Sequence, residues 1–225
     1  ASLEILDREK TRFFQNISHE LRTPLTLILS PLDTLPVNPS HQDELDLIQR
    51  NSRRLLRLVN QLLDFQKVRA TGHQLNLTPV DLAAFLRSSV HYFKLSCDKQ
   101  NLSLTSHFNG SPLDDVVHQL FVMGEIDALE KILFNLLSNA FKFTPAGGFI
   151  RVETTMRGKM AHIQVVDSGP GIAKDVQSRL FEEFSQAEGS SRGKYEGTGL
   201  GLALVKQLTE AMGGTCGVES ELEQG

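Results

Sequence analysis

The sequence predicts an α+β protein in two parts: an N-terminal helical hairpin that dimerises as a four-helix bundle, and a domain whose helices cover one face of a mixed sheet. Apolar residues recur at steps of three and four over residues 1–70, the period of amphipathic helices. From residue 74 onward, short runs that alternate apolar and polar residues interleave with helical segments. Thr71-Gly72 interrupts the helical pattern, so we expect domains over 1–72 and 73–225.

The composition is that of an ordinary soluble chain. It has 225 residues, of which 40% are hydrophobic and 22% charged, and a net charge of −4 that gives no reason to expect a nucleic-acid partner. Cys97 and Cys216 have no metal-ligand spacing, which favours a reducing cytoplasmic compartment over a disulfide framework. Because no apolar run approaches the roughly 18 residues of a membrane span, we expect no membrane contact by these residues.

The hairpin is predicted from a turn between two periodic segments. Residues 1–35 indicate one long helix, and residues 36–40, with two prolines and an asparagine, indicate a turn. A second helix, capped by Ser40, runs to about Ala70. Its heptad seam consists of Leu45, Ile48, Ser52, Leu55, Val59, Leu62 and Gln66. Further leucines widen the apolar surface beyond what one hairpin can cover, so we expect a homodimer through residues 1–70.

The second domain is predicted from its alternating elements. Strands are expected over residues 74–78, 101–108, 119–123, 149–156, 160–167 and 215–220, and helices after Asp81, over 127–143 and over 200–212. Residues 157–159 are expected to form a hairpin turn.

His19 is the first candidate for chemistry. It stands two positions from Ile17 and two from Leu21, and two residues turn a helix by about 200°, so its imidazole points away from the apolar stripe. Glu20 is adjacent, and Thr23 lies one turn later on the same face. This segment alone does not distinguish a reactive histidine from a solvated surface one.

A polar face on the helix over 127–143 is the second candidate. Asn135, Asn139 and Lys142 stand at i, i+4 and i+7 on a helix otherwise rich in Leu and Phe. Polar groups there are costly to bury unless something binds them. Amide oxygens are ligands that suit Mg²⁺, and a lysine suits phosphate, whereas the alternative is a polar edge that faces solvent.

Two glycine-rich turns complete the pattern. Asp167 ends a predicted strand and is followed by Gly169 and Gly171, so its carboxylate could accept a hydrogen bond from an exocyclic amine such as that of adenine, while the glycines let backbone approach a flat ligand. A second stretch, residues 197–201, runs directly into a helix whose first N–H groups suit phosphates. It matches neither a Walker A loop nor a dinucleotide-binding fingerprint. Either turn alone could be plain structure, but together with the asparagine face they indicate a nucleotide.

Over essentially its whole length the chain resembles the catalytic core of a two-component sensor histidine kinase. Ser18-His19-Glu20-Leu21-Arg22-Thr23-Pro24-Leu25 resembles the phosphoacceptor box of that family. The segments 135–143, 167–172, 181–184 and 197–202 resemble its N, G1, F and G2 boxes. The resemblance implies a dimerisation and phosphotransfer hairpin followed by a Bergerat-type ATP-binding α/β sandwich. Details near His19 and at residues 184–187 resemble the hybrid branch, whose chains often carry a receiver domain downstream.

The resemblance also implies roles for individual residues. His19 would be phosphorylated, Glu20 would accept its proton, and Thr23 would assist a reverse phosphatase reaction. Asn139, helped by Asn135, would hold Mg²⁺. The ATP-binding residues would be Asn135, Asn139, Lys142, Phe143, Asp167, Gly169, Gly171, Ile172, Phe181, Arg192, Lys194, Gly197, Thr198, Gly199, Leu200 and Gly201, with residues 185–196 as a lid. The expected partners are a second copy of the chain and a response-regulator receiver domain, in the cytoplasmic part of a sensor.

Three rival functions follow from the same residues. An ATPase of the same fold, as in gyrase, the heat-shock chaperone or mismatch-repair proteins, carries a Glu four residues before the Mg²⁺-binding Asn. Here Asn135 holds that position and cannot act as a base at neutral pH, which favours transfer to a side chain over hydrolysis. A nucleotide-binding scaffold would fit if His19 or the asparagine pair were lost, and a purely structural coiled coil would explain only residues 1–70.

Overall fold

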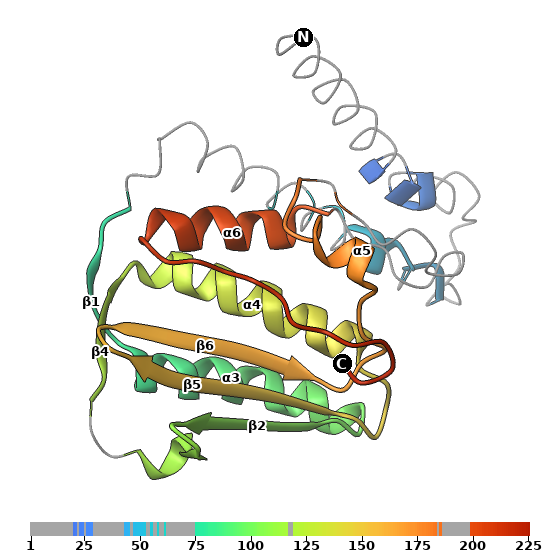
Figure 1. Cartoon of the computed structure of the whole chain (residues 1–225). Helices are drawn as coiled ribbons and strands as arrows, with labels where there is room; N and C mark the ends of the chain where they lie inside the picture. The colour runs from blue at the N-terminus through green and yellow to red at the C-terminus, as the bar shows by residue number, and fades with distance from the viewer. Residues whose placement is uncertain are drawn as a thin grey trace, which may run out of the picture.

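The computed structural model describes residues 75–116, 119–183, 185 and 199–225 (Figure 1). Before residue 75 it describes residues 20, 21, 23, 24, 26–28, 43–45, 47–52, 55, 58 and 61, all of them helical as expected for the two predicted helices. The predicted turn over residues 36–40 lies outside the described residues.

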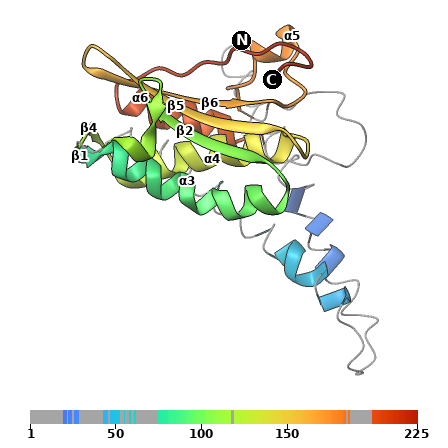
Figure 2. The ribbon, with the colours of Figure 1, turned by 90° about the horizontal axis from the view of Figure 1, so that it is seen from below.

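The second domain is a two-layer sandwich of helices and a mixed sheet. Its elements are β1 Thr78–Asp81, α3 Leu82–Lys99, β2 Ser103–Phe108, β3 Ser111–Pro112, the 3₁₀ helix η1 Leu113–Asp115, β4 Phe121–Gly124, α4 Ile126–Phe143, β5 Phe149–Arg157, β6 Met160–Asp167, α5 Lys174–Gln177 and α6 Gly201–Ala211. The four-stranded sheet has the order β3-β2-β5-β6; β2 and β5 run parallel and the other pairs antiparallel, while β1 pairs with β4 separately. Helices α3, α4 and α6 all lie on one face of the four-stranded sheet (Figures 1 and 2), which confirms the predicted α+β fold.

Helix α3 begins and ends at residues that favour those positions. The carboxylate of Asp81 accepts hydrogen bonds from the backbone N–H of Ala84 at 3.3 Å and of Leu120 at 3.4 Å, so one side chain caps α3 and holds the chain that leads into β4. The helix ends before Asn101, which has φ +57, a conformation that asparagine tolerates better than most residues.

The main core lies between the sheet and the helices α3 and α4. It includes Val80, Leu82, Phe85, Leu86, Val90, Leu133, Leu137, Ala140, Ile150 and Val152. Each fully buried aliphatic side chain contributes about 1.5–3 kcal/mol to the stability of this layer. A second cluster, formed by Ala128 of α4 with Leu204 and Leu208 of α6, holds these two helices against each other. The core therefore fixes the positions of α4, β6 and α6, which carry the candidate motifs.

The predicted strand over residues 215–220 is wrong. Its alternation is real, because residues 216, 218 and 220 are half-buried and residues 215, 217 and 219 are exposed. However, this segment forms no ladder with the described strands, and the sheet ends at β6. A strand needs backbone pairing as well as a buried face, and only the second can be read from local sequence.

No helix within the described part of the chain has the length and apolar content needed to span a membrane.

Candidate functional site

Helix α4 presents the predicted asparagine face, and Asn135 lies against the first residue of α6. The side-chain nitrogen Nδ2 of Asn135 donates a hydrogen bond to the carbonyl of Lys131 at 2.7 Å, which leaves Oδ1 directed at Gly201. A Cβ atom on Gly201 would lie 2.7 Å from this oxygen, closer than real Cβ atoms approach such a neighbour. The structure therefore brings the predicted N and G2 segments together through Asn135 and Gly201.

The other members of this face lie toward the end of α4. The side chain of Asn139 is half-buried and makes no hydrogen bond within the described part of the chain. The ammonium group of Lys142 lies 4.8 Å from the centre of the Phe143 ring, a cation–π distance. Phe143 itself is 37% exposed, so an aromatic ring remains accessible where the helix ends.

The turn after β6 places Asp167 next to the end of α4. The backbone N–H of Gly169 donates to Asp167 Oδ1 at 2.8 Å, and the second oxygen, Oδ2, makes no hydrogen bond with described residues. A Cβ on Gly169 would lie 2.6 Å from Asp167 Oδ1 and 3.3 Å from the carbonyl oxygen of Phe143. This glycine thus permits a close approach between the turn and α4, and it brings Asp167 and Phe143 to one place.

Gly171 has a different neighbour from the one expected. It has φ +70, and a Cβ atom there would overlap the carbonyl oxygen of Glu221 in the C-terminal segment. The close approach at this glycine was expected from a flat ligand, whereas in the structure the chain itself makes that approach. Ile172 is likewise tied to the C-terminal segment, since its N–H donates to Ser220 Oγ at 2.8 Å.

The start of α6 has the features of an anion-binding helix end. Gly199 has φ +70, Leu200 is buried, and no side-chain hydrogen bond from a described residue caps the helix. The first N–H groups of an α-helix have no partner inside the helix, and the helix dipole places partial positive charge there. These groups lie beside Asn135, so an amide oxygen and backbone donors face one region.

Some predicted site residues lie outside the described part of the chain: His19, Arg192, Lys194, Gly197 and Thr198, together with residues 186–196 of the lid. Glu20 and Thr23 are helical, Glu20 half-buried and Thr23 exposed. Phe181 is half-buried in the turn that follows α5. Gln177 and Ser220 were not predicted. Ser220 accepts a hydrogen bond from the N–H of Ile172 in the turn after β6, and its carbonyl accepts one from Gln177, so both bonds join residues far apart in the chain.

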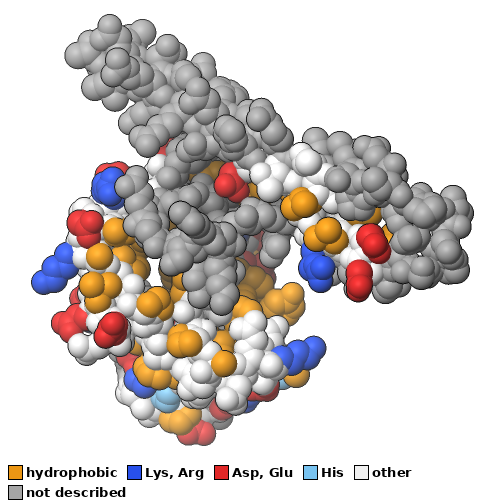
Figure 3. Space-filling view, turned by 90° about the vertical axis from the view of Figure 1, so that its right-hand side faces the viewer, with side chains coloured by type: hydrophobic (Ala, Val, Ile, Leu, Met, Phe, Trp, Pro, Cys, Tyr) orange, Lys and Arg blue, Asp and Glu red, His pale blue; other side chains and the backbone are white. Residues whose placement is uncertain are grey.

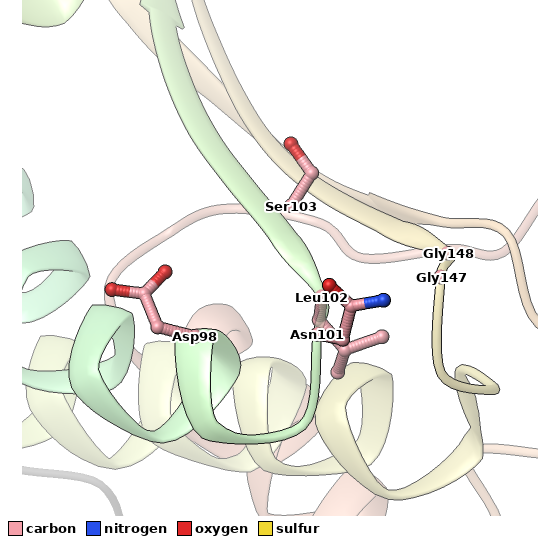
Figure 4. Close-up of a pocket in the computed structure, with 6 residues that line it drawn as sticks. All are labelled: Asp98, Asn101, Leu102, Ser103, Gly147 and Gly148. Carbon is pink, nitrogen blue, oxygen red and sulfur yellow. The ribbon is translucent and has the colours of Figure 1, made fainter.

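A separate hollow lies near the end of α3 (Figure 4). It has a volume of about 360 Å³ and is lined by Asp98, Asn101, Leu102, Ser103, Gly147 and Gly148. None of the predicted site residues lines it, so we place the candidate site by the chemistry of the converging motifs. On the face shown in Figure 3, acidic, basic and hydrophobic side chains are interspersed over the described surface.

Comparison with known families agrees with this geometry. Residues 124–225 match the family "Histidine kinase-, DNA gyrase B-, and HSP90-like ATPase", and residues 9–71 match the "His Kinase A (phospho-acceptor) domain". The chain belongs to the histidine kinase family. The resemblance of the chain to a two-component histidine kinase core is therefore confirmed.

The chain is similar to curated proteins that are much longer than it is. The chain is 36% identical to "Hybrid signal transduction histidine kinase D" of Dictyostelium discoideum over 93% of its length, and 38% identical to "Sensor histidine kinase TmoS" of Ectopseudomonas mendocina over 95%. It spans 14% and 22% of the lengths of these two relatives.

Solved structures support the histidine kinase fold. Full-length ShkA in complex with AMPPNP matches with a TM-score of 0.68 and 30% identity, over 95% of this chain and 43% of that one. Histidine kinase ThkA, solved with the response regulator protein TrrA, matches with a TM-score of 0.68 over 95% of this chain and 57% of that one. Because the identity to ThkA is only 20%, this second match supports the fold and nothing further.

Proposed function

We propose that this histidine kinase core binds ATP in its C-terminal domain, transfers the γ-phosphoryl group to His19 and then passes it to an aspartate of a receiver domain. The proposal is supported by the close approach of three motifs, which lie on α4, at the start of α6 and in the turn after β6. Asn135 of α4 meets Gly201 of α6, and the end of α4 meets the turn that holds Asp167. The match of residues 124–225 to a family of ATPases, and the AMPPNP bound in the similar structure of ShkA, support ATP as the nucleotide.

Each group at this site has a role in binding the nucleotide. The Oδ2 atom of Asp167 would accept a hydrogen bond from the adenine amine, and the exposed ring of Phe143 would line the base. The N–H groups at the start of α6 and the ammonium of Lys142 would meet the phosphates. In this proposal the base lies at the end of β6 and the phosphates lie at the start of α6.

Mg²⁺ fits the oxygen donors on α4. The side chain of Asn135 is turned so that its oxygen, not its nitrogen, faces the start of α6, and that of Asn139 has no protein hydrogen bond among described residues. Hard divalent cations prefer such oxygen ligands and keep waters and phosphate oxygens as the rest. We propose that Asn139 and Asn135 hold the ion, whose chemistry is to neutralise phosphate charge.

The transfer step requires His19, with Glu20 beside it. A neutral imidazole nitrogen of His19 would attack the γ-phosphorus, the bond to the β,γ-bridging oxygen would break, and ADP would leave. Glu20 would accept the proton that the imidazole gives up, and Thr23 would assist the reverse, phosphatase reaction. Arg192 and Lys194 of the lid would contact the phosphates and exclude water during transfer.

We further propose that residues 1–72 form the dimerisation and phosphotransfer domain and residues 73–225 the catalytic domain. Leu45, which begins the predicted seam, is 53% exposed in the single chain, and Leu27 is 38% exposed. A second copy would bury such side chains in a four-helix bundle. The match of residues 9–71 to the phosphoacceptor domain supports this division.

Incubation with γ-labelled ATP tests the proposal. The wild-type chain should acquire a label that is lost in acid and retained in base, as expected for a phosphohistidine, and His19→Gln should acquire none. Release of phosphate without labelled protein would instead identify an ATPase, and equal labelling of the His19→Gln variant would exclude His19 as the acceptor.

A further inference from the structure

Two side chains outside the predicted motifs connect the turn after β6 to the C-terminal segment. Gln177, at the end of α5, donates from Nε2 to the carbonyl of Ile172 at 2.6 Å and to the carbonyl of Ser220 at 2.9 Å. The hydroxyl of Ser220 accepts from the N–H of Ile172 at 2.8 Å and donates to the carbonyl of Gly225 at 2.8 Å. We call this set, Gln177, Ser220 and the backbone of Ile172 and Gly225, the clasp.

Backbone contacts extend the clasp along the turn. The N–H of Glu223 donates to the carbonyl of Pro170 at 2.8 Å. Gly171 and Gly225 lie so close to the backbone of Glu221 and Asp167, respectively, that a Cβ on either would overlap a carbonyl oxygen. Residues 170–172 of the turn after β6 are therefore enclosed by the C-terminal segment.

The clasp lies next to Asp167, which the proposed function assigns to the base. The turn that it holds begins at Asp167, whose Oδ1 is already fixed by the N–H of Gly169. Its other end leads through Ala173 into α5, and α5 leads on to Phe181. Figure 1 shows the C-terminal end of the chain and α5 at the same end of the sheet, where β6 ends.

We propose that Gln177 and Ser220 are positioning residues that set the affinity and the base selectivity of the nucleotide site by fixing the turn that carries Asp167. This inference rests on the proposed nucleotide site. Neither side chain touches the groups assigned to the phosphates, so the clasp acts on recognition of the base and not on phosphoryl transfer. Without these hydrogen bonds the turn would sample several conformations, and only a fraction of the molecules would present Asp167 correctly.

The chain offers a matched control for Ser220. Ser178 is an exposed serine one residue after Gln177, and its hydroxyl donates only to the carbonyl of Asp175, three residues earlier. Ser178→Ala removes a serine hydroxyl next to the clasp without touching it. Ser220→Thr keeps the hydroxyl, and Gln177→Met keeps much of the side-chain length while removing the donor.

The test is calorimetric titration of the full chain with AMPPNP and with the corresponding guanine nucleotide, GMPPNP, in the presence of Mg²⁺. Ser220→Ala and Gln177→Met should each weaken AMPPNP binding about tenfold, as expected for the loss of one or two hydrogen bonds. Binding of GMPPNP should change by less, so that selectivity for adenine falls. Ser220→Thr and Ser178→Ala should bind both nucleotides as the wild type does.

A kinetic measurement separates positioning from general destabilisation. In autophosphorylation assays the clasp variants should have a raised KM for ATP and an unchanged rate at saturation. An equal loss of affinity for both nucleotides together with a lower melting temperature, or wild-type affinity in both variants, would overturn the proposal. If Ser220→Ala fails to fold, Gln177→Met and Ser220→Thr decide it by the same criteria. A wild-type chain that binds no nucleotide would instead overturn the proposed function itself.

Discussion

At the scale of single residues, glycines at the candidate site are explained by particular neighbours. Gly169 allows the turn after β6 to meet the carboxylate of Asp167 and the end of α4, Gly171 allows the C-terminal segment to approach, and Gly201 allows α6 to meet Asn135. By contrast, a Cβ on Gly217 would meet nothing within 4 Å. The first three glycines assemble the site, and substitutions at them should act on nucleotide binding.

Gly201→Ala is the sharpest of these substitutions. The added methyl group would lie 2.7 Å from Asn135 Oδ1 and must displace either this oxygen or the start of α6. We expect the affinity for Mg²⁺-AMPPNP to fall on the order of tenfold, because a displaced Asn135 oxygen would lose its proposed contact with the charged ligand, and such a contact contributes about 1.5–3 kcal/mol. Gly217→Ala is the matched control and should leave the affinity unchanged in calorimetry. Equal affinities for the two variants would show that Asn135 and Gly201 do not act together.

Cys97 gives a second prediction at this scale. Burial raises the pKa of the Cys97 thiol, and the neighbouring carboxylate of Asp98 raises it further. The folded chain thus holds the thiol proton more tightly than the unfolded chain, so this contribution to stability is complete below the ordinary thiol pKa and is lost as the pH rises above it.

At pH 8, iodoacetamide should modify the half-buried Cys216 before Cys97, which is 1% exposed. Mass spectrometry that finds equal rates at the two cysteines would contradict the buried position of Cys97.

At the scale of elements, local pattern predicted those long enough to show a period. The helical periodicity of apolar residues identified α3, α4 and α6. The alternation of apolar and polar residues identified β2, β5 and β6, together with the hairpin turn between β5 and β6. The strand β3, with two residues, and the helix α5, with four, are too short to show any period. The parallel pairing of β2 with β5 depends on a crossover that no local pattern encodes.

The difference between local patterns and contacts of distant residues also explains which candidate site residues could be predicted. Asn139 and Asp167 stand out because polar residues interrupt or end apolar elements. Gln177 and Ser220 do not, because their hydrogen bond joins positions 43 residues apart and exists only in the folded chain. The strand expected over residues 215–220 failed for a related reason, since its alternation reflects burial without a pairing partner.

Asp81 gives the prediction at this scale. Its carboxylate caps α3 through Ala84 and also accepts from the N–H of Leu120, so Asp81→Ala leaves two donors without this acceptor. We expect the free energy of unfolding in urea to fall by about 1–2 kcal/mol. Ser88→Ala, which removes an exposed hydroxyl that bonds only to the carbonyl of Ala84, should change it by less than about 0.5 kcal/mol. If Asp81→Ala and Ser88→Ala unfolded at the same urea concentration, the hydrogen bonds of Asp81 would not contribute measurably to the stability of the domain.

At the scale of the whole molecule, the two apolar clusters among the described residues both lie within residues 75–225. The larger cluster joins α3, α4 and the sheet, and the smaller one joins α4 and α6. Because neither cluster includes a described residue before Leu75, we expect the domain to keep its fold when the predicted hairpin is absent.

Removal of residues 1–70 tests this division. The remaining chain should be a monomer in sedimentation and should bind AMPPNP with the affinity of the intact chain, whereas the intact chain should be a dimer. A dimeric remnant would place the interface in the catalytic domain and contradict our assignment.

In the proposed function, one site, built from α4, the turn after β6 and the start of α6, holds the nucleotide with its metal. Calorimetric titration of the Asn139→Ala variant with AMPPNP, with and without Mg²⁺, tests it most directly, with Ser138→Ala on the exposed side of the same helix as the control. We expect Asn139→Ala to lose Mg²⁺-dependent binding while the dimer and the Ser138→Ala variant remain as in the wild type. Unchanged Mg²⁺-dependent affinity in the Asn139→Ala variant would contradict it.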